Sequence, residues 1–181
     1  MKRLSRWILG LFGWRITQGV PPEIKKCVIV VAPHTSNWDF VIGRLAFFAL
    51  GLPVRFLIKK EIFVFPLGPL LKWLGGIPVD RRKSGGMVAQ VARMFDRYEQ
   101  LYIIITPEGT RSLNPNWKKG FYYIALKANV PLALGVLDYR EKWGGIEKIL
   151  YPSGDFEKDF KEVEEVYRGR GARHPEKFNL S

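Results

Sequence analysis

The stretch Cys27-Val-Ile-Val-Val-Ala-Pro-His-Thr-Ser-Asn-Trp-Asp39 joins a continuous apolar run directly to a polar turn. Residues 27–32 are rich in β-branched side chains, a pattern typical of a strand that is buried on both faces. The polar turn leads into an apolar segment, residues 38–50, that we expect to be a helix. A buried strand that passes through a polar turn into a helix is the repeating unit of an α/β sheet.

The same unit recurs along the chain. Further strands are expected at residues 54–58, 77–79, 101–106, 132–137 and 146–151. Helices are expected between and after them, at residues 66–74, 86–100, 119–128 and 156–168. The tail from Gly169 is expected to be frayed. We therefore predict a single α/β domain over residues 21–181, with a mixed, largely parallel sheet flanked by helices.

Residues 1–20 are predicted to form a separate amphipathic segment that lies on a membrane surface. Its apolar positions recur at the spacing of one helical face: Leu4, Trp7, Ile8, Leu11 and Phe12. Basic residues flank this face: Lys2, Arg3, Arg6 and Arg15. Basic flanks and tryptophans suit a helix lying at the interface of anionic lipid, and the alternative is a helix packed on the protein's own core.

The charge of the chain is strongly positive and unevenly distributed. The net charge is +12, and residues 1–140 carry 21 Lys and Arg against 8 Asp and Glu, whereas residues 141–181 carry 8 against 9. Such a basic body indicates an anionic partner, which can be nucleic acid, an anionic membrane or a phosphorylated substrate. A single cysteine, Cys27, excludes an internal disulfide, and two histidines are too few for a typical zinc site. We expect neither a metal nor a bound cofactor.

Two polar loops follow the carboxyl ends of predicted strands, where ligands bind in open α/β sheets. In the first loop, His34 precedes Asp39 by five residues. An Asp that folds back onto a His fixes its tautomer and makes it a general base. The alternative is that Asp39 and its neighbours only cap the following helix. The chain has no G-x-S-x-G nucleophile motif, so a His–Asp pair would activate a substrate hydroxyl.

The second loop, residues 106–112, combines an acid, a base, two hydroxyls and a glycine. Arg111 offers a planar fork suited to phosphate, Gly109 allows close backbone approach, and Glu108 can accept from a hydroxyl or brace an arginine. A third cluster, residues 80–83, places three cations after a strand, as a phosphate clamp or a lipid-headgroup patch would require. For both segments the alternative is a polar turn exposed to solvent.

Together these segments resemble the blocks of the glycerolipid acyltransferase family, which includes the 1-acylglycerol-3-phosphate acyltransferases. The blocks are His-x4-Asp at residues 34–39, G-G-I-P-V-D-R at 75–81, P-E-G-T-R-S at 107–112 and V-P-L at 130–132. The resemblance covers about residues 28–137. Pro33, Thr106, Pro78 and Leu134 depart from the commonest residues of the family's blocks, which bears on the identity of the acceptor.

The resemblance implies catalysis by His34 as general base, with Asp39 as its orienter. It implies a substrate-binding site made of Asp80, Arg81, Glu108, Gly109, Thr110, Arg111 and Lys119. The implied reaction moves a fatty-acyl group from acyl-CoA or acyl carrier protein to a hydroxyl of a lysophospholipid, with 1-acylglycerol-3-phosphate giving phosphatidic acid. We expect the protein to be a peripheral protein on the cytoplasmic face of an anionic membrane. We expect no nucleic-acid partner.

Two other functions stay open at the level of the sequence. The same blocks would serve a remodelling acyltransferase that acts on another lysolipid or on an amino-acid lipid. A non-catalytic basic module that binds a membrane surface or nucleic acid would explain the charge equally well. It would not explain why His, Asp, Glu and Arg gather at strand ends.

Overall fold

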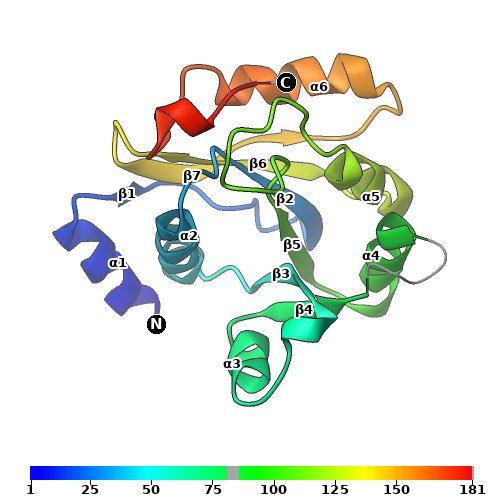
Figure 1. Cartoon of the computed structure of the whole chain (residues 1–181), viewed down its shortest axis with the longest axis horizontal. Helices are drawn as coiled ribbons and strands as arrows, with labels where there is room; N and C mark the ends of the chain where they lie inside the picture. The colour runs from blue at the N-terminus through cyan, green and yellow to red at the C-terminus, as the bar shows by residue number, and fades with distance from the viewer. Residues whose placement is uncertain (81–85, 181) are drawn as a thin grey trace.

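The computed structural model describes residues 1–80 and 86–180, which are built around a seven-stranded sheet (Figure 1). The strand order is β1-β7-β6-β2-β5-β3-β4. The strands are β1 (Arg15–Ile16), β2 (Lys26–Ala32), β3 (Val54–Lys59), β4 (Gly76–Val79), β5 (Leu101–Ile105), β6 (Leu132–Asp138) and β7 (Trp143–Leu150). All neighbouring pairs are parallel except β6 and β7. The predicted α/β class with a mixed, largely parallel sheet is confirmed.

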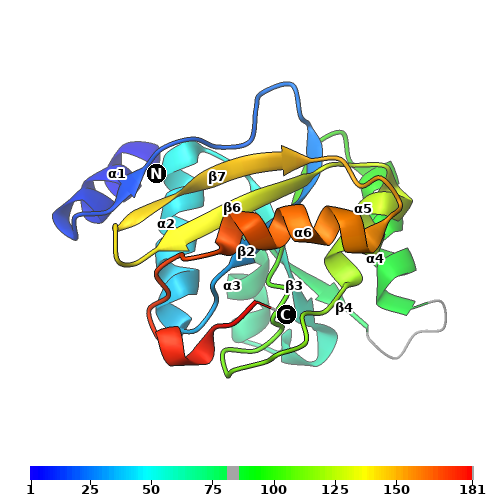
Figure 2. The same ribbon diagram turned by 90° about the horizontal axis from the view of Figure 1, so that it is seen from above.

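Helices cover both faces of this sheet. They are α1 (Lys2–Leu11), α2 (Asn37–Leu50), α3 (Leu67–Trp73), α4 (Gly86–Arg97), α5 (Gly120–Ala128) and α6 (Phe156–Tyr167). Short 3-10 turns occupy Lys60–Ile62 and Pro175–Lys177. Figure 1 shows α2 below the sheet and α6 above it, and Figure 2 shows α6 running along β6. The chain is therefore a sandwich of a sheet between two helical layers.

Strand β2 lies at the centre, and its side chains alternate between the two layers. Val28 and Val30 point into the cluster formed with α4, α5 and α6. Cys27 and Ile29 point into the cluster that includes Phe47 of α2. All four side chains are fully buried, which explains why this strand reads as a continuous apolar run.

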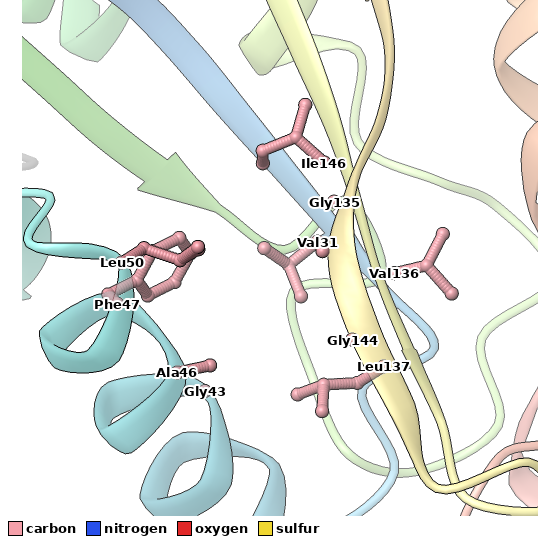
Figure 3. Close-up of a pocket in the computed structure, with 11 residues that line it drawn as sticks. Val31, Gly43, Ala46, Phe47, Leu50, Gly135, Val136, Leu137, Gly144 and Ile146 are labelled. Atoms are coloured by element: carbon pink, nitrogen blue, oxygen red, sulfur yellow. The ribbon is translucent and has the colours of Figure 1, made fainter. Parts of the chain in front are cut away.

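Helix α2 starts at the edge of the sheet because its first turn is capped by side chains. Ser36 accepts from the backbone N–H of Trp38, and Asp39 reaches back to the N–H of Ser36 in a capping box. The helix ends at Gly51, whose φ of 73° is left-handed. Between α2 and the sheet lies an apolar cavity of about 30 Å³, which has room for only one or two waters (Figure 3).

Helix α1 packs against α2 through a face different from the one singled out in the sequence. Ser5 and Leu9 are its buried residues. The predicted apolar face is largely exposed, with Leu4, Trp7 and Leu11 each more than half accessible. Within the part of the chain that the structure describes, no helix combines the length and apolarity needed to cross a bilayer.

The prediction of a frayed tail after Gly169 is wrong. The N–H of Tyr139 donates to the Gly171 carbonyl at 2.7 Å, and the Trp117 indole donates to the Asn179 carbonyl at 3.1 Å. Ala172 is buried, and the apolar side chains near the end pack on the core. These contacts hold the tail against the domain, although its sequence has no helical or strand periodicity.

Candidate active site

The turn between β2 and α2 brings His34 and Asp39 together. Nδ1 of His34 lies 3.3 Å from Oδ2 of Asp39, with the histidine side chain 19% exposed and the aspartate 2%. The same Oδ2 accepts the backbone N–H groups of Thr35 at 2.7 Å and Ser36 at 2.8 Å. The aspartate therefore caps the helix and contacts the histidine at once, so the two interpretations of this turn are compatible.

A third residue, Tyr139, completes this group. Its hydroxyl donates to Oδ1 of Asp39 at 2.6 Å. Burial alone would raise the pKa of Asp39, but the hydrogen bonds from His34, Tyr139 and the Ser36 N–H outweigh it and hold that pKa below its usual value. Tyr139 follows directly after β6, which is parallel to β2, so its place at a strand end was the signal that sequence reasoning missed.

The second loop contacts the first through Glu108. Strands β2 and β5 are parallel neighbours with Val30 opposite Ile105, so the loops that follow them meet. Oε1 of Glu108 accepts the backbone N–H of His34 at 2.8 Å. Its Oε2 is buried and has no hydrogen-bond partner among residues 1–80 and 86–180. Burial raises the pKa of Glu108 to about 7. The hydrogen bond from the His34 N–H lowers this pKa but does not outweigh the effect of burial.

Gly109 shapes the turn of this second loop. Its φ is 66°, and a Cβ at this position would stand 2.8 Å from the Lys118 ammonium nitrogen. The backbone N–H of Lys118 also donates to the Pro107 carbonyl at 2.8 Å. The left-handed backbone favours a glycine here, and a larger residue would also displace the end of the Lys118 side chain.

Arg111 ties the two loops together at the surface. Its Nη1 donates to Oδ1 of Asn37, the first residue of α2. The side chain is exposed, as is that of Thr110, whose Oγ1 accepts the N–H of Ser112. This contact places the guanidinium, a group suited to bind phosphate, beside the first residue of α2.

Two other predicted substrate-binding residues, Asp80 and Lys119, lie farther from this group. Asp80 follows β4 at the same edge of the sheet, two strands and roughly 10 Å from β5. Arg81 lies outside the described residues. The ammonium of Lys119 pairs with Glu157 of α6 at 3.1 Å and lies over the Phe156 ring, so the lysine next to the second loop is Lys118, not Lys119.

The C-terminal tail contributes a residue that the sequence did not reveal. The guanidinium of Arg173 lies 5.5 Å from the ring centroid of Trp38 and 5.8 Å from that of Tyr139. The next residue, His174, donates its backbone N–H to Oγ1 of Thr35. The tail thus holds a cation beside the turn of His34 and Asp39, although its sequence has no periodicity that would predict its position.

The arrangement suits general-base catalysis. Because Nδ1 of His34 faces Asp39, Nε2 is the nitrogen left to take a proton from a substrate. Among the residues that the structure describes, no Ser or Cys side chain hydrogen-bonds to His34. Over the same residues, no group of three or more His, Cys, Asp or Glu is placed to hold a metal ion.

Comparison with known proteins agrees with this geometry. A family model described as acyltransferase matches residues 15–133, which include both loops and the paired His34 and Asp39. The chain belongs to the acyltransferase family. Together with the two relatives described next, this match confirms the resemblance to the glycerolipid acyltransferases drawn from the sequence motifs.

Two relatives of the chain are named as 1-acyl-sn-glycerol-3-phosphate acyltransferases. The 1-acyl-sn-glycerol-3-phosphate acyltransferase beta of Homo sapiens is 31% identical over 141 residues, 73% of this chain and 48% of that protein. A probable 1-acyl-sn-glycerol-3-phosphate acyltransferase of Mycoplasma pneumoniae is 31% identical over 137 residues, 72% of this chain and 52% of that protein. The chain therefore spans about half the length of the curated relatives it matches.

A solved acyltransferase structure shares the fold. The 1-acyl-sn-glycerophosphate acyltransferase PlsC from Thermotoga maritima superposes with a TM-score of 0.61 at 18% identity, covering 95% of this chain and 80% of that one. The likeness supports the architecture of the sheet and its two helical layers.

Proposed function

We propose that this chain transfers a fatty-acyl group from an acyl thioester to the free hydroxyl of 1-acylglycerol-3-phosphate, giving phosphatidic acid for phospholipid biosynthesis. The observation that carries the proposal is the pairing of His34 with Asp39 at the sheet edge where Arg111 also lies. The names of both curated relatives support this acceptor. The thioester donor is acyl-CoA or acyl carrier protein.

In the proposed step, Nε2 of His34 takes the proton of the acceptor hydroxyl while its oxygen attacks the thioester carbonyl. The C–O bond forms, the tetrahedral intermediate collapses, and the C–S bond breaks. The histidine then returns the proton to the departing thiolate, so it leaves the cycle in its starting form. General-base assistance of this kind contributes about 10² to 10⁴ in rate.

Asp39 supports this step by holding the imidazole and offsetting its transient positive charge. The donors that keep the pKa of Asp39 low also keep its carboxylate charged during the reaction. Arg111 is suited to hold the acceptor phosphate, because a fork of N–H donors binds phosphate oxygens in a fixed geometry. Binding of the phosphate would place the hydroxyl near the thioester and lower the entropic part of the barrier.

We propose further that the protein works as a peripheral protein on the cytoplasmic face of a membrane. Both substrates carry acyl chains, and the exposed side chains of Leu4, Trp7 and Leu11 on α1 offer an apolar surface to lipid. The basic residues of the same helix would be attracted to anionic headgroups.

An acyl-transfer assay tests the proposal directly. Purified protein in mixed micelles is given acyl-CoA or acyl carrier protein as donor, together with a panel of lysophospholipids, and the products are followed by mass spectrometry. The variant His34→Ala is compared with His174→Ala, which removes the chain's other imidazole at an exposed position.

We expect phosphatidic acid from wild type and His174→Ala, and at least a hundredfold loss with His34→Ala. Product from another lysolipid with none from 1-acylglycerol-3-phosphate would reassign the acceptor. If no acceptor is acylated while the protein still binds anionic vesicles, the proposal of an enzyme would be wrong, and a non-catalytic membrane-binding module would take its place.

A further inference from the structure

A second cavity lies on the side of α2 remote from the catalytic turn. Its volume is about 380 Å³, and it opens between the start of α1, the end of α2 and the segment after α3. Gly51, at the end of α2, lines this cavity, whereas Asn37, at its beginning, belongs to the catalytic turn. Gly51 is roughly 20 Å along the helix axis from Asn37, and Arg44, which lines the cavity midway along α2, is roughly 10 Å from it.

Arg44 is the most unusual residue of this cavity. Its Nε and Nη1 are buried and have no hydrogen-bond partner in residues 1–80 and 86–180. Its guanidinium lies 4.1 Å from the centroid of the Phe48 ring. Burial, and then the charge of Arg55, lower the pKa of Arg44, and no carboxylate contributes to that shift. The side chain as a whole is partly exposed, but buried donor atoms are normally hydrogen-bonded, so these two nitrogens lack an acceptor that an anion in the cavity would supply.

Two more cations line the same cavity, Lys2 from α1 and Arg55 from β3. Gly51 makes room for Lys2, because a Cβ there would stand 2.3 Å from the Lys2 nitrogen. The side chains of Arg44 and Arg55 both come within contact distance of Gly75, since a Cβ on Gly75 would stand 3.8 Å from Nη2 of Arg44 and from Cδ of Arg55. Three positive groups from three elements therefore converge on one space.

We propose that this cavity binds the phosphate group of a membrane phospholipid, at a site separate from the catalytic loops. Phosphate matches the site because its oxygens accept from a guanidinium fork and from an ammonium group at once. The inference rests on the proposed membrane location of the protein and is independent of acyl transfer.

The surroundings of the cavity favour a lipid headgroup over a soluble phosphate. Trp73, which lines the cavity, is 68% exposed, and Phe65, just before the same helix, is 90% exposed. Trp7 on α1, the other helix at the opening, is 63% exposed. Aromatic side chains of this kind prefer the headgroup level of a bilayer, where lipid phosphates also lie. A bound headgroup would then fix α1 and α3 on the membrane.

Thermal unfolding of the full chain in the presence of a soluble short-chain lipid tests the site without a membrane. The probe is dihexanoyl-phosphatidylglycerol below its micelle concentration, with inorganic phosphate as the second arm. The variant is Arg44→Met, which keeps the length of the side chain but not its charge. The matched control is Lys72→Met, an exposed cation beside Trp73 that does not line the cavity.

We expect the lipid to raise the Tm of wild type and of Lys72→Met. Arg44→Met should need at least about tenfold more lipid for the same rise, because it lacks the charged donors. Its Tm without lipid should equal or exceed that of wild type, since two buried donor atoms without an acceptor have been removed. Arg55→Met, an exposed change at the same cavity, should weaken the lipid effect in the same direction.

Equal lipid responses of Arg44→Met and Lys72→Met would overturn the site. A marked fall in the lipid-free Tm of Arg44→Met would do so too, because it would make the guanidinium a structural group. An equal rise with inorganic phosphate and lipid would reassign the cavity to a soluble phosphate. Failure of wild type to bind vesicles, with an intact response to the soluble lipid, would instead contradict the proposed membrane location alone.

Discussion

The hydroxyl of Tyr139 lies 2.6 Å from Oδ1 of Asp39, although the two residues are 100 positions apart in the chain. The other oxygen of the same carboxylate faces His34. Tyr139 thus holds Asp39 from the side opposite the histidine, and the strand β6 that precedes it is a neighbour of β2 in the sheet. The orientation of the proposed base depends on two adjacent strands, not on one turn.

Tyr139→Phe should slow acyl transfer while leaving the fold intact. It removes one hydrogen bond to a charged acceptor, so we expect kcat to fall about tenfold with little change in KM. The ring keeps its edge-to-face contact with Trp14, whose centroid is 5.0 Å away. Tyr151→Phe, at an exposed tyrosine, is the matched control. A rise in KM with unchanged kcat would show that Tyr139 binds substrate instead of positioning Asp39.

Glu108→Gln should change the pH dependence of stability in a defined direction. The pKa of Glu108 is raised from 4.5 to about 7 in the folded protein. Between these values the folded state binds more protons than the unfolded state, so this group makes stability fall as pH rises. Gln keeps an oxygen for the N–H of His34 and carries no charge. We expect the stability of the variant relative to that of wild type to rise across this range, with a total change on the order of 3 kcal/mol.

Urea unfolding at a series of pH values measures this difference. Glu99→Gln, an exposed change of the same kind, gives the baseline for removal of one negative charge. The opposite result would be a free energy of unfolding of wild type that rises relative to that of Glu108→Gln as pH rises through the range. The buried carboxylate would then be stabilised in its charged form, and our account of its environment would be wrong.

Arg111→Ala should weaken binding of the phosphate-bearing acceptor. Loss of charge-assisted hydrogen bonds to phosphate would raise KM for 1-acylglycerol-3-phosphate about tenfold or more, with a much smaller effect on an acceptor without phosphate, such as monoacylglycerol. Arg97→Ala, on the exposed side of α4, is the control for net charge. Asn37→Ala should give an intermediate effect, because it frees Arg111 without removing its charge. Equal losses on both acceptors would assign Arg111 to the structure of the loop.

The central part of the fold follows closely from the sequence. The strand predicted at 27–32 is Lys26–Ala32, and the helix predicted at 38–50 is Asn37–Leu50. A β-branched run and a capping box define these two elements locally. Strand β7 begins at Trp143, three residues before its predicted start, because Gly144 and Gly145 interrupt the apolar pattern. Strand β1 has only two residues and therefore no periodicity to detect.

Only those residues of the site that directly follow a strand could be predicted from the sequence. The sequence placed His34 and Glu108 after the ends of two strands, and the parallel pairing of these strands in the structure brings the two residues together. The contribution of Arg173 depends on how the tail folds back, which no local pattern encodes. The choice between Lys118 and Lys119 depends on the direction of a side chain at the start of α5, and the motif alone does not specify it.

Helix α1 offers a direct contrast between its two faces. Trp7→Ser removes an exposed ring and should weaken partition into anionic vesicles about tenfold or more, with no loss of Tm, because the apolar area that would enter the lipid is lost. Leu9→Ala removes a buried side chain and should lower stability by about 2 kcal/mol. Vesicle flotation and thermal unfolding on both variants separate the effects. If Trp7→Ser lowered Tm and left flotation unchanged, its ring would serve the protein's own packing, and α1 would lose its proposed role at the membrane.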